Sequence, residues 1–240
     1  MENMDYSLKA EMHVHSNTDK LFCLPFLYDS VQSVEVIINR AFHLGIKIIS
    51  ITDHNSLNGY KLCKNIIKKL DLDMILIPGC EISTKGGHVL AYNIKNQIKS
   101  FMSAEETIEE IHKQSGIAIA AHPYNFNSIK NGVFNLDFDA IEAYNSKSFL
   151  WMNKMARKAA EKLNLPCTAG SDAHQIENIG NAMMLFPKNT ETSDDVINNI
   201  ISGNFKIKFK RTRFFPMILN HIYKNFSNFK ENSNQSPAFR

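Results

Sequence analysis

The sequence lacks several features that would assign it to a specialised class of protein. Among its 240 residues no apolar run approaches the roughly 20 that a membrane-spanning helix needs, and the N-terminal stretch does not resemble a signal peptide. The four cysteines are scattered, without a CxxC pair or a dense disulfide framework. A composition of 44% hydrophobic and 21% charged residues argues against wholesale disorder. We therefore expect a folded cytoplasmic protein with reduced thiols.

Charge is distributed unevenly along the chain. Residues 204–240 contain eight Lys/Arg and a single acidic residue, whereas the rest of the chain contains 19 basic and 23 acidic residues. Alternating apolar and basic residues at 205–213 predict an edge strand, and an apolar stripe predicts a helix that starts at Pro216. We divide the chain into a main domain, residues 1–203, and a basic C-terminal extension, residues 204–240, whose end is expected to be disordered.

Short apolar runs alternate with longer segments of helical periodicity. The runs cover residues 8–12, 46–52, 74–80, 116–121, 139–144 and 166–170, and a hairpin strand is expected at 85–93. Helices are expected within 30–45, 56–70, 104–116 and 148–164; in the first of these, Ser33 could cap the helix and Gly45 could end it. This alternation predicts an α/β fold with a parallel sheet, either open or closed into a barrel.

Histidines and carboxylates follow the predicted strands. They are His13, His15, Asp53, His54, Glu81, His88, His122, Asp172 and His174, and Glu142 and Asn145 belong to a further strand and its end. Because the carboxyl ends of parallel strands share one rim, we expect these side chains to converge. His13 and His15, two residues apart on an extended chain, point to the same side and could hold one ion.

Imidazole and carboxylate ligands favour Zn²⁺, Mn²⁺ or Fe, whereas an all-oxygen set would favour Mg²⁺ or Ca²⁺. The number of candidate ligands suggests two to three divalent metal ions with a bridging carboxylate. Two ions about 3.5–4 Å apart can activate a water and stabilise both the attacking and the leaving oxygen in a phosphoryl displacement. The pattern therefore predicts that His13 and His15 bind metal.

The motifs MHVHS, ITDHNSLNGY, IPGCEIS, GHVLAY, AAHPY and GSDAH resemble, in this order, those of the polymerase and histidinol phosphatase (PHP) family of metal-dependent phosphoesterases. The resemblance covers roughly residues 8 to 186. It implies a distorted (β/α)7 TIM-like barrel with a trinuclear metal site. It also implies that a metal-bound hydroxide attacks the phosphorus atom in line.

The resemblance further implies a ligand set for each ion. The first ion would take His13, His15, Glu81 and Asp172; the second would share Glu81 and add His88 and His122; the third would take His54, His174 and an acid after the HxHS motif. Asp19 is the natural candidate for that acid, and Asp29 is the alternative. Glu81, Asp172 and His174 would be the catalytic residues, while Asp53, Glu142 and Asn145 would orient the imidazoles.

Simpler explanations exist for some of these residues. A single histidine at a strand end is more often a hydrogen-bonded loop residue than a ligand, Asp53 could cap a helix near Ser56, and Glu142 could be a solvated carboxylate. The extension could pack on the barrel, or it could contact nucleic acid or an anionic membrane surface.

The leading functional hypothesis is hydrolysis of a phosphate ester of a small molecule or short nucleotide. The alternatives are a 3′–5′ exonuclease that uses the basic extension to hold nucleic acid, a non-catalytic metal module, and C–N hydrolysis of the amidohydrolase type. The substrate-binding residues are not determined by the sequence; Lys20, Tyr124, Asn125, Asn145 and Lys147 are candidates by position alone.

Overall fold

A computed structural model of the protein describes residues 5–18, 30–126 and 128–212. The strands are β1 (Tyr6–Val14), β2 (Ile46–Ile51), β3 (Ile75–Leu76), β4 (Gly79–Thr84), β5 (Gly87–Tyr92), β6 (Ile117–Ala120), β7 (Ala140–Asn145), β8 (Cys167–Gly170), β9 (Ala182–Pro187) and β10 (Lys206–Phe209). The helices are α1 (Val34–His43), α2 (Asn58–Lys69), α3 (Ala104–Lys113), α4 (Leu150–Leu163) and α5 (Ser193–Ile201), with short 3-10 helices η1 (Lys130–Asn135) and η2 (Ile176–Asn178).

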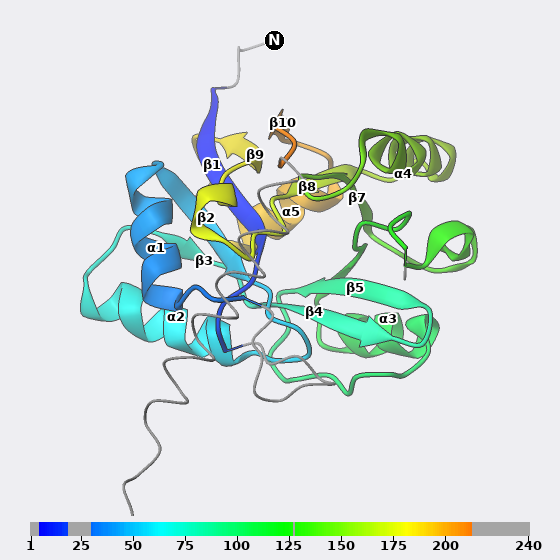
Figure 1. Cartoon of the computed structure of the whole chain (residues 1–240), viewed down its shortest axis with the longest axis horizontal. Coiled ribbons are helices and arrows are strands. Elements are labelled where there is room, and N and C mark those ends of the chain that lie inside the picture. Colours follow the sequence, from blue (N-terminus) through cyan, green and yellow to red (C-terminus); the bar gives the residue numbers. More distant parts are fainter. Residues whose placement is uncertain (1–4, 19–29, 127, 213–240) are drawn as a thin grey trace, which may run out of the picture.

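These strands form two five-stranded sheets, in the orders β10-β9-β1-β2-β3 and β4-β5-β6-β7-β8 (Figure 1). Pairing is parallel for β1–β2, β2–β3, β6–β7 and β7–β8, and antiparallel for β1–β9, β9–β10, β4–β5 and β5–β6. The predicted α/β class is confirmed. The expectation of a parallel sheet was wrong in part, because the β4–β5 hairpin and strand β9 introduce antiparallel pairs. Within the described residues the strands make two sheets rather than one closed barrel of seven βα repeats.

The two sheets meet through single bridges at the strand ends. Val14 bridges Ala173 beyond β8, and His54 beyond β2 bridges Glu81 in β4. The backbone N–H of Asp172 donates to the His13 carbonyl at 2.8 Å, which ties the chain after β8 to β1. These contacts bring the carboxyl ends of β1, β2 and β8 next to β4.

Helix boundaries follow from capping residues. Ser33 accepts a hydrogen bond from the backbone N–H of Val36, and Gly45, with φ of +67°, follows the end of α1. The four helices expected from the sequence are all present. Helix α5 and strand β9 were missed; α5 starts with a capping box in which Thr192 and Asp195 exchange hydrogen bonds with each other's backbone.

The core consists of three clusters of buried aliphatic side chains on the two faces of the sheets. Helices α1 and α2 pack on β2, α3 packs on β5 and β6, and α4 packs on β7 (Figure 1). Isoleucine supplies much of the volume: Ile48, Ile49 and Ile51 of β2 are fully buried. β-Branched side chains suit such strands because they fill both faces of a covered sheet.

Part of the C-terminal extension belongs to the first sheet. β10 pairs with β9 at the edge of that sheet, so the edge strand predicted at 205–213 is confirmed over Lys206–Phe209. The helix expected from Pro216 and the disordered end lie outside the described residues. None of the helices in the described ranges is long and apolar enough to cross a membrane.

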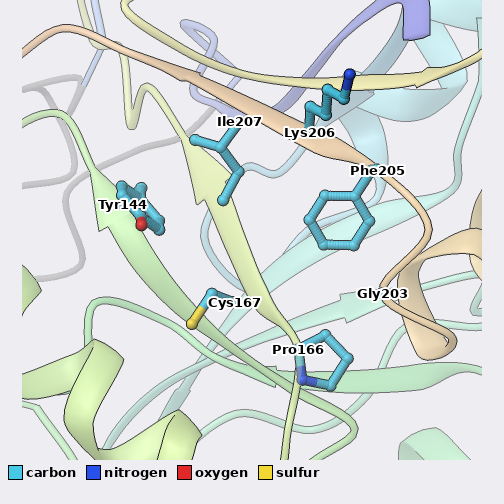
Figure 2. A pocket seen from close by; sticks show the side chains of 7 residues that line it. All are labelled: Tyr144, Pro166, Cys167, Gly203, Phe205, Lys206 and Ile207. Carbon is cyan, nitrogen blue, oxygen red and sulfur yellow. The ribbon is translucent and has the colours of Figure 1, made fainter. Parts of the chain in front are cut away.

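A pocket of about 560 Å³ lies beside β10 (Figure 2). Its lining consists of Tyr144, Pro166, Cys167, Gly203, Phe205, Lys206 and Ile207. None of these residues is among the histidines and carboxylates that the sequence singles out.

Candidate metal centre

The predicted site residues within the described ranges lie together where the two sheets meet. His13 lies near the C-terminal end of β1, and His15 follows that strand. His54 follows β2, His122 follows β6, and Asp172 and His174 follow β8. One expectation was wrong in detail: Glu81 does not follow a strand. It lies inside β4, because Pro78 separates the two-residue strand β3 from β4, which then pairs with β5.

Glu81 is the centre of the cluster. Its Oε2 atom lies 3.2 Å from Nε2 of His13, 3.1 Å from Nε2 of His15 and 3.5 Å from Nδ1 of His54. Its Oε1 atom lies 2.9 Å from Nδ1 of His88 and 3.0 Å from Nε2 of His122. Each oxygen therefore faces its own set of imidazoles, the arrangement expected of a carboxylate that bridges two ions.

His13 is oriented from behind by Glu142. The His13 Nδ1 atom lies 2.7 Å from Oε1 of Glu142, so the imidazole donates its Nδ1–H to that carboxylate and its Nε2 is directed at the cluster. This Nε2 is 3.1 Å from Nε2 of His15, and both rings are fully buried. Two imidazole nitrogens at that distance, with a carboxylate beside them, need a cation or a shared proton between them. The donor set therefore fits a divalent cation.

The second carboxylate oxygen of Glu142 extends the same support. Its Oε2 accepts hydrogen bonds from the backbone N–H of His122 at 2.9 Å and from Nδ2 of Asn145 at 3.0 Å. Asn145 Nδ2 also donates to Oδ2 of Asp172 at 3.1 Å. Glu142 is therefore a buried, fully bonded carboxylate and not a solvated one, and Asn145 contacts the two carboxylates rather than an imidazole.

Asp172 joins the cluster from the end of β8, in the same sheet as Glu81 and Glu142. Its Oδ1 lies 3.6 Å from Nε2 of His15 and 3.9 Å from Nε2 of His13, and 3.1 Å from Nζ of Lys147. His174 lies beside it, with its ring centroid 4.3 Å from that of His15. Among the described residues, four groups of three side chains have ligand atoms within 4.8 Å of one another: His13–His15–Glu81, His13–His122–Asp172, His54–Glu81–His88 and His15–His54–His174.

Burial alone would raise the pKa values of the Glu81 and Asp172 carboxyls, but the positive charges around them have the larger effect. The imidazoles of His54, His88 and His13 hold the pKa of Glu81 well below its usual range, and Lys147 and His13 do the same for Asp172. Conversely, the pKa of His13 lies well above its ordinary value: burial lowers it, but the charges of Glu142 and Glu81 prevail. The cluster thus keeps ionised carboxylates and attracts positive charge.

Asp53 supports the segment after His15 and does not cap a helix, and its expected role in orienting imidazoles stays a prediction. Its Oδ1 accepts the backbone N–H of Ser16 at 2.6 Å, and its Oδ2 accepts the hydroxyls of Ser16 and Thr18. Helix α2 begins after Leu57 without a side-chain cap, so Asp53 does not cap it. Asp53 instead fixes the chain that follows His15. Asp19 and Asp29, the candidates for the third ion, lie outside the described residues.

Two residues near the cluster were not assigned a role from the sequence. Glu11 is fully buried and accepts backbone hydrogen bonds from Gly180 at 2.8 Å and Ser171 at 3.2 Å; burial raises its pKa to about 7. An acidic residue within the apolar run LKAEM was the available signal. Lys147, proposed only by its position, is in direct contact with Asp172.

The backbone at the site is held in unusual conformations. His122 has φ of +26° and Asp172 has φ of +51°, in the region that favours glycine. Such conformations persist only where surrounding contacts enforce them, and they are common at functional sites. Here the enforcing contacts include the Glu142 bond to the His122 N–H and the Asp172 N–H bond to the His13 carbonyl.

Comparison with known proteins agrees with this architecture. The PHP-associated family model matches residues 151–205. The uncharacterized protein MJ1587 of Methanocaldococcus jannaschii is 35% identical over 144 residues, which cover 58% of this chain and 82% of that protein. Among solved structures, a Bacteroides vulgatus two-domain protein containing a predicted PHP-like metal-dependent phosphoesterase aligns with a TM-score of 0.68 and 18% identity over 88% of this chain and 67% of that one.

A further structural likeness is to endonuclease Q in complex with a 27-mer duplex substrate that has an abasic lesion at its active site. The TM-score is 0.59, with 18% identity over 84% of this chain and 58% of that chain. Fold and site together define a mixed α/β protein whose His/carboxylate cluster has a donor set that suits divalent metal ions. The chain belongs to the PHP family.

Proposed function

We propose that the protein is a metal-dependent phosphoesterase that hydrolyses a phosphate ester of a small molecule or short nucleotide. The proposed ligands are His13, His15, His54, Glu81, His88, His122, Asp172 and His174, with Asp19 completing the third site. Two to three ions of Zn²⁺, Mn²⁺ or Fe would be held, with Glu81 shared between two of them. We further propose that the two sheets are the two halves of the distorted (β/α)7 barrel of the family.

A single observation carries this proposal: the two oxygens of Glu81 face different imidazoles. Oε2 is directed at His13 and His15, and Oε1 at His88 and His122. A merely structural buried glutamate would need one or two hydrogen-bond donors, not imidazoles on both oxygens. A carboxylate so placed supports two ions at one substrate phosphate.

The chain's own residues prepare the site for this chemistry. Glu142 retains the proton of His13 on Nδ1, which leaves Nε2 directed at the cluster. Glu81 and Asp172 remain ionised at neutral pH because their pKa values are held low. Their burial limits access of bulk water and so strengthens electrostatic interactions with a bound phosphate.

When bound, the ions would supply Lewis-acid stabilisation of the phosphate oxygens and lower the pKa of a coordinated water. The proposed catalytic residues are Glu81, Asp172 and His174. Glu81 lies at the centre of the cluster, and Asp172 and His174 lie at its edge, in contact with Lys147. Asp53 supports the loop after β1, and Glu142 and Asn145 hold the imidazole and carboxylate ligands in place.

The test is the substitution Glu81→Gln, with His13→Ala as a second variant. Both should lose bound metal and should lower hydrolysis of p-nitrophenyl phosphate by more than about 100-fold, since loss of a mere supporting contact costs about 10–100-fold. Metal content by mass spectrometry and turnover with added Mn²⁺ are the measurements. Glu109→Gln and His43→Ala, at exposed positions on α3 and α1, are the matched controls. Unaltered metal content and turnover in Glu81→Gln would refute the proposal.

The second candidate is a nuclease acting on DNA or RNA ends. Two observations favour it: the likeness to endonuclease Q and the basic residues that begin with Lys206 and Lys208 of β10. A panel of monoesters, dinucleotides and single-stranded oligomers, assayed with Mn²⁺, separates the two. Faster turnover of oligomers than of any monoester would select the nuclease.

A further inference from the structure

Lys147 brings an ammonium group to the edge of the metal cluster. Its Nζ atom lies 3.1 Å from Oδ1 of Asp172 and 3.2 Å from Nδ1 of His174. The side chain is 26% exposed, whereas that of Asp172 is only 5% exposed. Lys147 therefore lies on the solvent side of the buried Asp172 carboxylate.

The loop that carries Lys147 is fixed from within. Oδ1 of Asn145 accepts the backbone N–H groups of Lys147 at 3.0 Å and of Ser148 at 3.1 Å. The same Asn145 donates through Nδ2 to Glu142 and Asp172. The position of the lysine backbone is thus coupled directly to the carboxylates of the site.

The chain after β10 holds this loop from outside. Thr212 donates its backbone N–H to the Ser146 carbonyl at 2.8 Å, and the hydroxyls of Thr212 and Ser146 are also 2.8 Å apart. The Arg211 Nε–H donates to the Ser148 carbonyl at 3.2 Å, and its guanidinium lies over the ring of Phe149. A loop restrained on both sides presents its lysine at low entropic cost, which is what preorganised ligand recognition requires.

We propose that Lys147 binds a non-bridging oxygen of a terminal phosphate and thereby makes the site selective for phosphomonoesters over phosphodiesters. The inference rests on the proposed function, because it assumes that a phosphate ester occupies the site. Asp172 and His174 are both proposed metal ligands. A phosphate held beside them brings an oxygen within reach of the Lys147 ammonium.

Selectivity follows from the number and charge of the phosphate oxygens. A monoester dianion has three non-bridging oxygens, so one remains for the lysine when the other two face the ions. A diester has two non-bridging oxygens and a single negative charge, and its remaining oxygen carries a second substituent. Only the monoester can therefore accept a charge-assisted hydrogen bond from Lys147 while its two other non-bridging oxygens face the ions.

The test compares Lys147→Met with wild-type protein on p-nitrophenyl phosphate and on bis-p-nitrophenyl phosphate. We expect kcat/KM for the monoester to fall about 10- to 100-fold, the loss typical of a hydrogen bond between charged groups, and that for the diester to fall by less than about threefold. Lys147→Arg should restore part of the monoester activity. Lys64→Met, at an exposed position on α2, is the control and should match wild type on both substrates.

Binding of inorganic phosphate to the Mn²⁺-loaded protein, measured by calorimetry, gives a readout independent of turnover. Lys147→Met should weaken it about 10-fold or more while metal content stays unchanged. Equal losses on the two esters, a wild-type preference for the diester, or unchanged phosphate affinity would overturn the inference. If wild type hydrolyses neither ester, the proposed function fails, and the phosphate titration still decides the role of Lys147.

Discussion

Close packing around Gly170 shows how single residues shape the site. A Cβ atom at this position would lie 2.4 Å from Oε1 of Glu142 and 2.4 Å from Cβ of His13. These two residues form the hydrogen bond that orients the His13 ring, so the glycine is what allows β8 to approach β1 behind the cluster. The position of Gly170 at a strand end already indicates from the sequence that it gives the backbone room, and the closeness of Glu142 and His13 agrees with this.

The first prediction concerns Gly170→Ala. The added methyl group must displace the Glu142 carboxylate or the backbone of β1, so we expect a loss of about 1–3 kcal/mol in the free energy of unfolding. Denaturant titration measures it, and metal affinity should fall as well because His13 moves. Gly86→Ala is the matched control, since a Cβ there meets nothing within 4 Å. Similar stability of the two variants would contradict the packing argument.

At the scale of elements, β10 links the C-terminal extension to both the core and the site. The ring of Phe205 lies 5.8 Å from that of Phe186 in β9, and the ring of Phe209 lies 5.7 Å from that of Tyr144 in β7. The chain then continues to Thr212, which is bonded to the loop of Lys147. Residues 204–212 are therefore part of the folded body, whatever the rest of the extension does.

The second prediction compares two truncations. Removal of 213–240 gives the reference protein, because it keeps all the described residues through Thr212. Removal of 204–240 deletes two aromatic side chains packed on the core and leaves β9 as an unprotected edge, so it should cost about 3 kcal/mol or more. Thermal denaturation of both proteins is the measurement. Only the shorter deletion can test whether the basic tail serves nucleic-acid binding. Equal melting temperatures would show that β10 contributes no stability.

At the scale of the whole molecule, the candidate metal centre joins the two sheets. His13 and His15 come from the first sheet and its loops, whereas Glu81, His88 and His122 come from the second. Ions held between them would act as cross-links between the sheets, and binding to the native state alone raises stability by mass action.

The third prediction is that chelation lowers the melting temperature. At free metal 100 times the dissociation constant, the stabilisation is about 2.7 kcal/mol, which should appear as a fall of several degrees with EDTA and recovery with Mn²⁺. His13→Ala should show a much smaller response, and His43→Ala on α1 should respond like wild type. A melting temperature indifferent to chelation and to added metal in the wild-type protein would argue against ions between the sheets.

The hydrophobic pattern by itself determined the α/β class, the four longer helices and the positions of most strands, because periodicity and capping are local properties. It missed β9 and α5, although β9 is as long as β2 and α5 begins with a capping box. The sequence also identified the histidines and carboxylates that converge, since these residue types at strand ends are unusual in a plain core. Their roles as ligands remain a proposal.

Tertiary structure alone decided which atoms meet. The contact of Lys147 with Asp172 and the support of His13 by Glu142 join residues 25 and 129 positions apart. The placement of Glu81 inside an antiparallel hairpin likewise depends on pairing with β5, not on its own run of residues. Such contacts result from strand register and the packing of two sheets, which no local pattern encodes, because each is a sum over partners that are distant along the chain.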